Sequence, residues 1–508
     1  MSSTDALSSE EANFRGRIPD SRADIDASCR DVLLPWYASA VVWLLVGSVL
    51  AMLASIKLHT PWFLADSEWL TFGRVRPAHL STMIYGWASM SGIATLLWLT
   101  ARLCKRVLPF RLALASTSVY WNVMVAAGTI AILAGYSTSV EWLEFPWWVA
   151  VPLGAAFLVI FVATLYVFLD RRVEHIYVSQ WYLFGASIWF PFLYIAATLL
   201  IQLPLATGVT KAAANWWFAH NVLGLWLTPI GLASAYYLIP KVLGRPIHSY
   251  YLSIMGFWTL AIFYNWAGTH HLVGGPIPAW MVTVGIVGSM MMFVPVITVA
   301  VNHHFTVVGN FGVLRVSPTL RFTVFGAMSY TFVSFQGSLT SLRFVNETTH
   351  FTHYTIAHAH LGVYAFYTMV LFGAMYYILP RLVQQEWISS RLIRIHFWST
   401  AIGIAVYWIG LTFGGVWQGA MMNNPDIPFL SIVEKMIPFL WSRTLAGLLL
   451  TAGHVAFAIL VWHMVRRNGT WLVGPTLFTS NRTLSSTRQQ HEGVSNSTKG
   501  EPPEEFSS

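Results

Sequence analysis

Six histidines each lie close to one end of a long apolar run in this chain of 508 residues. They are His79, His220, His270, His271, His358 and His360. Imidazole nitrogen is a common ligand for iron and copper in proteins. A single histidine of this kind is typical of a hydrogen-bonded core or interfacial position. Six of them favour metal binding if the fold brings them to one depth.

The spacing of the histidines indicates how they would share metal ions. Helical residues turn by about 100° each, so His358 and His360 would face nearly opposite sides of one helix. That helix could serve two metals, whereas one zinc site favours positions three or four apart. The adjacent His270 and His271, with His220 as a third ligand, would leave an open position for a substrate. A sixth histidine, His79, could pair with one member of the 358/360 pair across a porphyrin.

Long apolar runs must position these side chains. Hydrophobic residues make up 56% of the sequence and charged residues 10%, against roughly 25% charged in soluble domains. Twelve runs approach the roughly 20 residues of a membrane-spanning helix. They cover residues 32–56, 79–101, 112–136, 146–169, 179–203, 217–240, 251–270, 277–302, 320–342, 356–380, 395–418 and 439–464. We predict an all-α integral membrane protein of about twelve helices, not a soluble enzyme, a disordered protein or a nucleic-acid binder.

Polar segments flank the apolar part. Residues 1–31 carry seven acids and four arginines and lack the apolar core of a signal peptide. We predict a cytoplasmic N-terminal segment over 1–31, one membrane domain over 32–468 and a polar, disordered tail over 469–508. Two cysteines, Cys29 and Cys104, exclude a disulfide framework, a Cys-x-x-Cys-His haem attachment and an iron–sulfur cluster.

Loop charges predict the orientation in the membrane. Basic residues such as Arg102, Arg171 and Lys241 follow the even-numbered runs, which places both termini in the cytoplasm. Even runs then begin on the outer side and run seven ends there, so all six histidines fall in the outer third of the membrane. No run has a carboxylate at its middle, which argues against a carboxylate-relay transporter.

Several short motifs surround these histidines and are spread over at least five runs. They are Arg74-Val75-Arg76-Pro77-Ala78-His79, Ala219-His220-Asn221, Tyr236-Tyr237-Leu238-Ile239-Pro240-Lys241, Arg245-Pro246, Ser249-Tyr250-Tyr251-Leu252-Ser253-Ile254, Tyr264-Asn265-Trp266-Ala267-Gly268-Thr269-His270-His271, Tyr354-Thr355-Ile356-Ala357-His358-Ala359-His360 and Ser442-Arg443. Together they resemble the catalytic subunit of cbb3-type cytochrome c oxidases, the C family of haem–copper oxidases. The resemblance covers about residues 30–465 and implies the haem–copper oxidase subunit I fold in a bacterial inner membrane.

The resemblance implies a role for each histidine. His79 and His360 resemble the axial ligands of the low-spin haem b, and His358 resembles the single ligand of the high-spin haem b3. The copper ligands that face this haem, the CuB site, are matched by His220, His270 and His271. A five-coordinate iron opposite a three-histidine copper leaves room for dioxygen.

A tyrosine and a set of hydroxyl residues complete the implied site. Tyr264 lies seven residues before His271, two turns back on nearly the same face of an α-helix. It resembles a tyrosine that is cross-linked to the histidine matching His220 and that gives an electron and a proton during O–O cleavage; an interfacial tyrosine is the alternative. The family's proton-input path, the K-type channel, is matched by Tyr236, Tyr250, Ser253 and Tyr264. Hydroxyls that bond their own helix backbone are the alternative there.

Charged residues near the histidine layer have implied roles as well. Arg74, Arg76 and Arg443 would pair with haem propionates through bidentate guanidinium contacts, or else extend to the membrane interface. In the family, acids near the position of Glu141 and Glu144 help to bind calcium, so Glu144 is a candidate calcium ligand.

One position departs from the family pattern. The family usually has a glutamate in a Phe-Glu-Gly context beside the proximal histidine of the high-spin haem. Here the residues are Phe335-Gln336-Gly337, so Gln336 would keep a hydrogen bond but lose the charge that makes the imidazole more electron-donating.

We therefore predict the catalytic subunit of a terminal oxidase. It would reduce dioxygen to water with electrons from membrane-anchored mono- and di-haem c-type cytochrome subunits and protons from the cytoplasm, coupled to proton translocation. A nitric oxide reductase, with non-haem iron in place of copper, is the alternative. Those reductases usually carry a glutamate four residues after the first distal histidine, where this chain has Gly224, and they lack a tyrosine equivalent to Tyr264. A transporter without redox chemistry is a third possibility.

Overall fold

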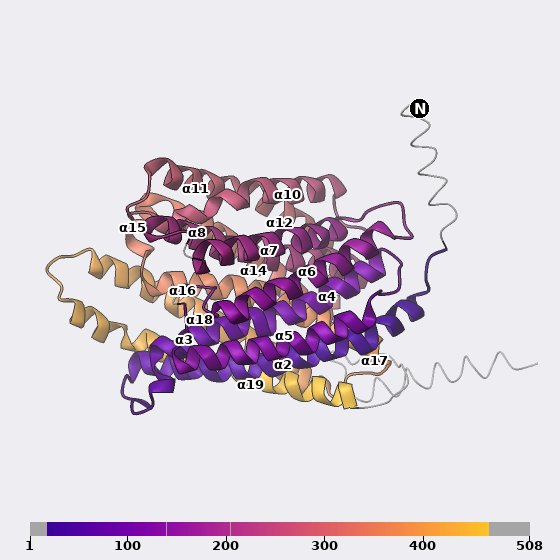
Figure 1. Cartoon of the computed structure of the whole chain (residues 1–508), viewed down its shortest axis with the longest axis horizontal. Coiled ribbons are helices and arrows are strands. Elements are labelled where there is room, and N and C mark those ends of the chain that lie inside the picture. The colour runs from indigo at the N-terminus through magenta and orange to yellow at the C-terminus, as the bar shows by residue number, and fades with distance from the viewer. Residues whose placement is uncertain (1–17, 139, 204, 467–508) are drawn as a thin grey trace, which may run out of the picture.

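A computed structural model describes residues 18–138, 140–203 and 205–466, and that part of the chain is built from helices (Figure 1). Labels with η mark 3₁₀ or π-helical segments. The elements are α2 (Arg22–His59), η1 (Glu68–Leu70), α3 (Phe72–Ser81), η2 (Thr82–Ala88), α4 (Ser89–Leu103), α5 (Arg111–Ala134), α6 (Trp147–Leu169), α7 (Val178–Gln202), α8 (Gly208–Val222), η3 (Leu223–Leu227), α9 (Thr228–Leu243), α10 (Tyr250–Phe263), η4 (Tyr264–Leu272), α11 (Ala279–Met291), α12 (Phe293–Val307), α13 (Val313–Val316), α14 (Pro318–Ser341), α15 (Arg343–Thr349), α16 (His353–His360), η5 (Leu361–Thr368), α17 (Met369–Val383), α18 (Ser390–Met422) and α19 (Phe429–Arg466).

The predicted all-α membrane fold is confirmed. Each of the twelve predicted runs coincides with helical structure to within a few residues. In the described part of the chain, nine helices are long and apolar enough to cross a membrane, and two of them are the continuous rods α8–η3–α9 and α16–η5–α17. The remaining three runs correspond to α3–η2–α4, α10–η4 and α14, and they stay predictions as membrane spans.

The first helix begins earlier than its apolar run. α2 starts at Arg22, where the Ser21 side chain accepts a hydrogen bond from the backbone N–H of Asp24 and caps the helix. One turn further, buried Asp26 accepts hydrogen bonds from Trp98 Nε1 at 3.0 Å and Arg102 Nη1 at 2.8 Å. These partners on α4 allow an acidic first turn to pack against the membrane domain. The predicted tail, 469–508, lies outside the described residues.

The helices lie roughly along one common direction. α3, α8, α15 and α16 gather toward one end of the bundle, on the left in Figure 1, whereas the described chain begins and α19 ends toward the other. α18 and α19 pack extensively on each other, and α19 also packs on α2, so the last helix closes the bundle against the first. Both ends of the described chain lie toward the same side of the bundle, which agrees with an even number of membrane crossings.

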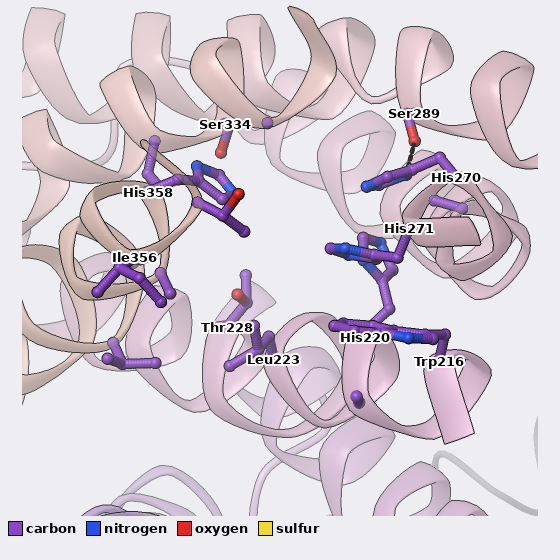
Figure 2. A pocket seen from close by; sticks show the side chains of 18 of the residues that line it. Trp216, His220, Leu223, Thr228, His270, His271, Ser289, Ser334, Ile356 and His358 are labelled. Atoms are coloured by element: carbon purple, nitrogen blue, oxygen red, sulfur yellow. Dashed lines mark hydrogen bonds between the residues drawn. The ribbon is translucent and has the colours of Figure 1, made fainter. Parts of the chain in front are cut away.

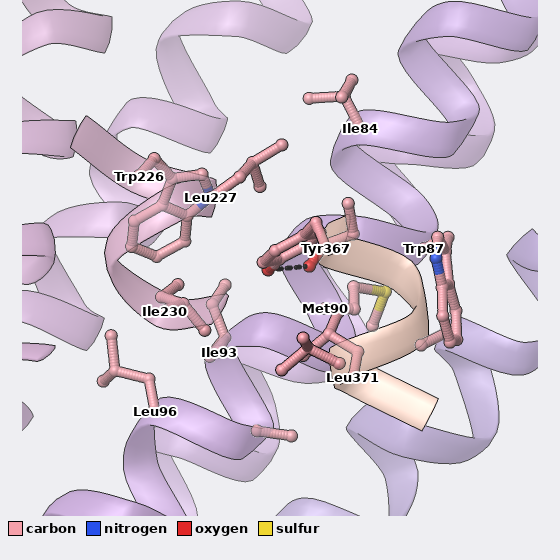
Figure 3. Packing of buried hydrophobic residues seen from close by; sticks show 14 of the residues in the cluster. Ile84, Trp87, Met90, Ile93, Leu96, Trp226, Leu227, Ile230, Tyr367 and Leu371 are labelled. Carbon is pink, nitrogen blue, oxygen red and sulfur yellow. Dashed lines mark hydrogen bonds between the residues drawn. The ribbon is translucent and has the colours of Figure 1, made fainter. Parts of the chain in front are cut away.

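Large side chains fill the middle of the bundle between η2–α4, η3–α9 and η5–α17 (Figure 3). Trp87, Trp226 and Tyr367 are each at most 2% exposed. Trp87 donates to Thr368 Oγ1 at 2.9 Å, and the Tyr367 hydroxyl donates to the carbonyl of Ala88 at 3.0 Å. These bonds satisfy polar atoms that would be costly to bury alone. The core therefore ties together the helical segments that follow the histidines.

Candidate metal centre

A cavity of about 470 Å³ separates two groups of histidines. Figure 2 shows His220, His270 and His271 together on one side and His358 on the opposite side. Its volume lies within the roughly 300–1,000 Å³ of cofactor pockets. The cavity therefore brings together four of the six predicted ligand histidines, which are spread over residues 220–358.

The three clustered histidines have the geometry of a metal site. One possible ligand atom from each of His220, His270 and His271 lies within 4.8 Å of the others. His220 Nδ1 is 3.3 Å from His271 Nε2, and two nitrogens bound tetrahedrally at about 2.0 Å would be about 3.3 Å apart. His270 Nδ1 lies 2.6 Å from Ser289 Oγ, whose hydroxyl donates to the Gly285 carbonyl. The His270 Nδ1–H is thus the donor, which leaves its Nε2 free for a metal.

One predicted relation within this group is wrong. Tyr264 to Leu272 forms a 3₁₀ helix, with about three residues per turn, and not an α-helix. Seven residues therefore turn about 120° beyond two full turns, so Tyr264 and His271 do not share a face. Tyr264 instead stacks on His220, with ring centroids 4.4 Å apart and planes inclined by 24°. His271 stacks on Trp216 at 4.3 Å.

Three π-helical segments follow histidines that were predicted as ligands, and sequence reasoning missed these segments. η2 begins three residues after His79, η3 three residues after His220, and η5 directly after His360. Such segments are rare and occur often at functional sites. A period of 3.6 residues cannot reveal them. Each segment contains a glycine, namely Gly86, Gly224 or Gly362.

His79 and His360 form a second pair outside the cavity lining. The Nδ1 atom of His79 lies 2.9 Å from the Gly47 carbonyl, and that of His360 lies 2.9 Å from the Ile356 carbonyl. Because a carbonyl only accepts, both rings carry their proton on Nδ1 and present Nε2 as a ligand. His358 lines the cavity and His360 does not, in agreement with the predicted opposite faces.

Gln336 differs from its predicted contact. It is buried, and its Oε1 accepts a hydrogen bond from Trp408 Nε1 at 3.2 Å. His358 Nδ1 is buried and has no hydrogen-bond partner in the described part of the chain. The glutamine therefore links α14 to α18 and does not bond the histidine.

The predicted arginines divide between the cavity and its surroundings. Arg76 lines the cavity and pairs with Glu141 at 2.5 Å. Arg74 donates to the Leu133 carbonyl at 3.2 Å. The Arg443 guanidinium lies 5.8 Å from the centre of the Tyr407 ring, which itself packs on His360 at 4.5 Å.

Glu144 is a buried carboxylate in the loop before α6. Its oxygens accept hydrogen bonds from the Ser81 hydroxyl at 2.8 Å and the Trp142 backbone N–H at 3.0 Å. Burial raises the pKa of Glu144 to about 7, while these two hydrogen bonds oppose the rise. Ser81 lies two residues after His79, so the carboxylate supports the turn that carries this histidine.

The hydroxyl residues predicted for proton entry divide into two groups. Asn302, which sequence reasoning missed, donates to Ser253 Oγ at 3.0 Å and lies 3.5 Å from the Tyr236 hydroxyl. The Ser253 hydroxyl itself bonds its own helix, at the Ser249 carbonyl. Tyr250 donates to the Ile176 carbonyl at 2.7 Å, away from this group.

Gly224 and Tyr264 depend on each other. A Cβ atom built on Gly224 would overlap the ring of Tyr264. A glutamate at position 224 is therefore incompatible with this placement of the tyrosine. The two differences expected from nitric oxide reductases, a glycine at position 224 and a tyrosine at position 264, therefore depend on one contact.

Comparison with known proteins identifies the family. Residues 31–449 match the family described as cytochrome c and quinol oxidase polypeptide I. The cbb3-type cytochrome c oxidase subunit CcoN1 of Stutzerimonas stutzeri is 32% identical over 84% of this chain and 93% of its own length. A nitric oxide reductase chain of the same organism is 27% identical over 48% of this chain and 53% of its own length. A solved haem–copper terminal oxidase dimer shares the fold, with a TM-score of 0.69 at 15% identity, covering 90% of this chain and 86% of that one.

This chain belongs to the cytochrome c and quinol oxidase polypeptide I family, as a cbb3-type member. It is a multi-pass membrane oxidoreductase of the haem–copper class. The residues present fit haem and copper as cofactors. Three imidazoles offer nitrogens at metal-binding distance, and one faces them across the cavity. Two more, His79 and His360, carry their proton on Nδ1 and leave Nε2 unprotonated, and the Nε2 of His360 lies 3.4 Å from the Tyr407 hydroxyl.

Replacement of Gly224 tests the contact with Tyr264. We expect Gly224→Ala to lower the stability of the purified complex by about 1–3 kcal/mol, the usual cost of an overpacked core. Thermal unfolding in detergent measures the change. In a Tyr264→Ala background the same replacement should cost much less. Gly312→Ala, where a Cβ has nothing within 4 Å, is the matched control, and an equal loss there would contradict the prediction.

Glu144 predicts a pH dependence of stability. The folded protein keeps this proton up to about pH 7, whereas the unfolded chain loses it near 4.5. The contribution of Glu144 to the free energy of unfolding is therefore fully present below pH 4.5 and is lost as the pH rises through 7. Thermal unfolding between pH 5 and 8, in the presence of a chelator, should show this slope in the wild type and a smaller one in Glu144→Gln. Equal slopes would exclude Glu144 as its source.

Proposed function

We propose that this subunit is the catalytic subunit of a terminal respiratory oxidase that reduces dioxygen to water. The observation that carries the proposal is the group of three histidines facing His358 across one cavity. We assign copper (CuB) to His220, His270 and His271, the high-spin haem b3 to His358, and the low-spin haem b to His79 and His360. The assignment is supported by the tautomers of His79, His270 and His360, whose protons lie on Nδ1 and leave Nε2 unprotonated.

When bound, haem iron and copper supply the electrons and the binding site for dioxygen. The reaction consumes one O₂, four electrons and four protons and releases two water molecules. The protein contributes ligands, an enclosed cavity and protons. Tyr264 lines the cavity and stacks on His220, so its phenol is suited to supply a proton beside the proposed copper. We propose that Tyr264 donates this proton, and an electron with it. We further propose a covalent link between a Tyr264 ring carbon and a His220 ring nitrogen, formed with loss of one C–H and one N–H hydrogen and with the two electrons and two protons taken up by dioxygen.

Protons reach Tyr264 from the cytoplasmic side in this proposal. Ser253, Asn302 and Tyr236 form the polar group that supports the path. Tyr250 lies nearer the inner end of α10, where it would mark the entrance. Uptake from this side, coupled to proton translocation, would conserve energy across a bacterial inner membrane with both termini in the cytoplasm.

The charged residues are proposed to hold the haem edges. Arg76 faces the cavity and Arg443 lies near His360, so both are suited to propionate groups. Arg74 is the third candidate for such a contact. Glu144 could contribute to a calcium site only if it ionises, since both of its oxygens already accept hydrogen bonds.

Electrons must come from other subunits in this proposal, since the sequence has neither a haem c motif nor a cysteine-bound copper site. We propose membrane-anchored mono- and di-haem c-type cytochromes as the donors, docked at the outer face. The polar segment 1–31 and the tail 469–508 are proposed to flank the oxidase domain on the cytoplasmic side.

Nitric oxide reduction is the second candidate function, and one observation opposes it. The iron-binding glutamate of that class would stand at Gly224, where Tyr264 fills the space. The partial similarity to the nitric oxide reductase of Stutzerimonas stutzeri reflects the shared family.

Metal analysis of the purified complex tests the proposed function. We expect one copper and two b haems per copy of this subunit, counted by elemental analysis and pyridine haemochrome spectra. His270→Ala should lose copper and keep the low-spin haem, whereas His360→Ala should lose the low-spin haem. His59→Gln, which alters a histidine bonded to Thr60 and Thr444, should lose neither.

The result also separates the alternatives. Absence of copper together with one additional non-haem iron would indicate a nitric oxide reductase. Absence of both copper and haem would overturn the histidine assignment.

Asn302 tests proton delivery. Asn302→Leu removes the bond to Ser253, and a lost buried hydrogen bond costs about 1–3 kcal/mol. We expect oxygen consumption to fall by roughly tenfold, with proton uptake slowed and haem reduction by the donor unchanged. Thr298→Val, on the same helix and bonded only to the nearby Pro295 carbonyl, is the control. An unchanged rate in Asn302→Leu would remove this residue from the path.

A further inference from the structure

A seventh histidine, His454 of α19, links two elements of the proposed low-spin haem site. It is 2% exposed and both ring nitrogens are bonded. Nδ1 lies 2.8 Å from Ser48 Oγ on α2, and Nε2 lies 2.6 Å from the Tyr364 hydroxyl on η5. None of the roles assigned above uses this residue.

The hydrogen-bond directions follow from Ser48. Its hydroxyl donates to the Leu44 carbonyl at 2.7 Å, so its oxygen accepts from His454 Nδ1–H. His454 Nε2 is then the acceptor of the Tyr364 proton. A neutral imidazole fulfils both bonds, which suits a site without a charged partner.

On one side, His454 reaches the support of His79. Ser48 directly follows Gly47, whose carbonyl accepts from His79 Nδ1 at 2.9 Å. Gly47 also lies against η2, because a Cβ there would stand 2.9 Å from the Met83 side chain. A shift of α2 at Ser48 therefore moves the acceptor that orients the His79 ring.

On the other side, His454 reaches the turn that follows His360. Tyr364 stands four residues after His360 within η5, where the helix is π-helical. The hydrogen bond between the Tyr364 hydroxyl and His454 joins this turn to α19. The position of the η5 backbone next to His360 thus depends on the same imidazole.

We propose that His454 is a positioning residue for the low-spin haem, which orients both axial histidines by holding Ser48 and Tyr364. This inference rests on the proposed function, because it takes His79 and His360 as the axial ligands. Loss of the imidazole would leave both partners with an unmet hydrogen bond in an apolar interior, so both elements would relax. A rotated or less strongly hydrogen-bonded axial imidazole has altered basicity toward iron.

His396 provides a matched comparison. It is also fully buried, bonds one tyrosine (Tyr376, at 2.9 Å), and packs on Phe372 and Phe457. Its tyrosine partner is not within a turn of a proposed ligand. Replacement of His396 thus reproduces the loss of a buried histidine at a site that shares Phe372 with His454 but bonds neither Ser48 nor Tyr364.

The experiment compares His454→Phe, Ser48→Ala, Tyr364→Phe and His396→Phe in the assembled complex. Readouts are the electron paramagnetic resonance g values of the low-spin haem and its midpoint potential in a redox titration. We expect His454→Phe to shift both, Ser48→Ala and Tyr364→Phe each to give part of the shift, and His396→Phe to give none. His454→Gln should recover part of the wild-type signal, since an amide can donate and accept.

The outcomes separate this inference from the proposed function. Unchanged g values and potential in His454→Phe, or an equal shift in His396→Phe, would overturn the positioning role. If His454→Phe does not assemble, Ser48→Ala and Tyr364→Phe decide, and no shift in either overturns it. A wild type without a low-spin haem would overturn the proposed function, and with it this inference.

Discussion

The fold depends on one constraint: imidazole nitrogens from separate helices must converge inside a membrane domain where every backbone polar group also needs a partner. Loops could present histidines freely in water, but lipid-exposed irregular backbone is excluded at membrane depth. This chain keeps its helices continuous and changes their pitch instead. The π-helical η2, η3 and η5 follow three of the proposed ligand histidines, and the 3₁₀ segment η4 carries two more. Pitch changes thus aim side chains while most backbone bonds are kept.

The same constraint applies to the ring nitrogen of each histidine that does not face the proposed metal. The Nδ1–H groups of His79 and His360 donate to backbone carbonyls, and that of His270 donates to Ser289, so each ring has a defined tautomer with an unprotonated Nε2. These acceptors sit on helices other than the ligand's own for His79 and His270, which makes helix packing part of the ligand geometry. Close packing then requires small residues, as at Gly224 beneath the Tyr264 ring.

Much of this could be predicted from residue types and spacing, because apolar length and histidine position survive any local change of pitch. The helical runs, the opposite faces of His358 and His360, and the grouping of His220 with His270 and His271 are examples. Contacts that depend on helix rotation could not be predicted. Because η4 has a 3₁₀ pitch, Tyr264 and His271 lie on different faces. The bond of Asn302 to Ser253 depends on the packing of α12 beside α10, which the sequence does not indicate. The helix cap at Ser21 and the ion pair of Asp26 were likewise hidden from a hydropathy pattern.

His358 differs from His79, His270 and His360. Its Nδ1 has no protein acceptor within the described residues, and the nearby Gln336 carbonyl oxygen accepts from Trp408 instead. A hydrogen bond to a carboxylate would make such an imidazole a stronger electron donor to iron. Without it, the ring donates less, and a bound high-spin haem would favour its reduced state. Gln336 instead connects α14 to α18 across the interior. This position therefore provides a contact between two helices and no hydrogen bond to His358.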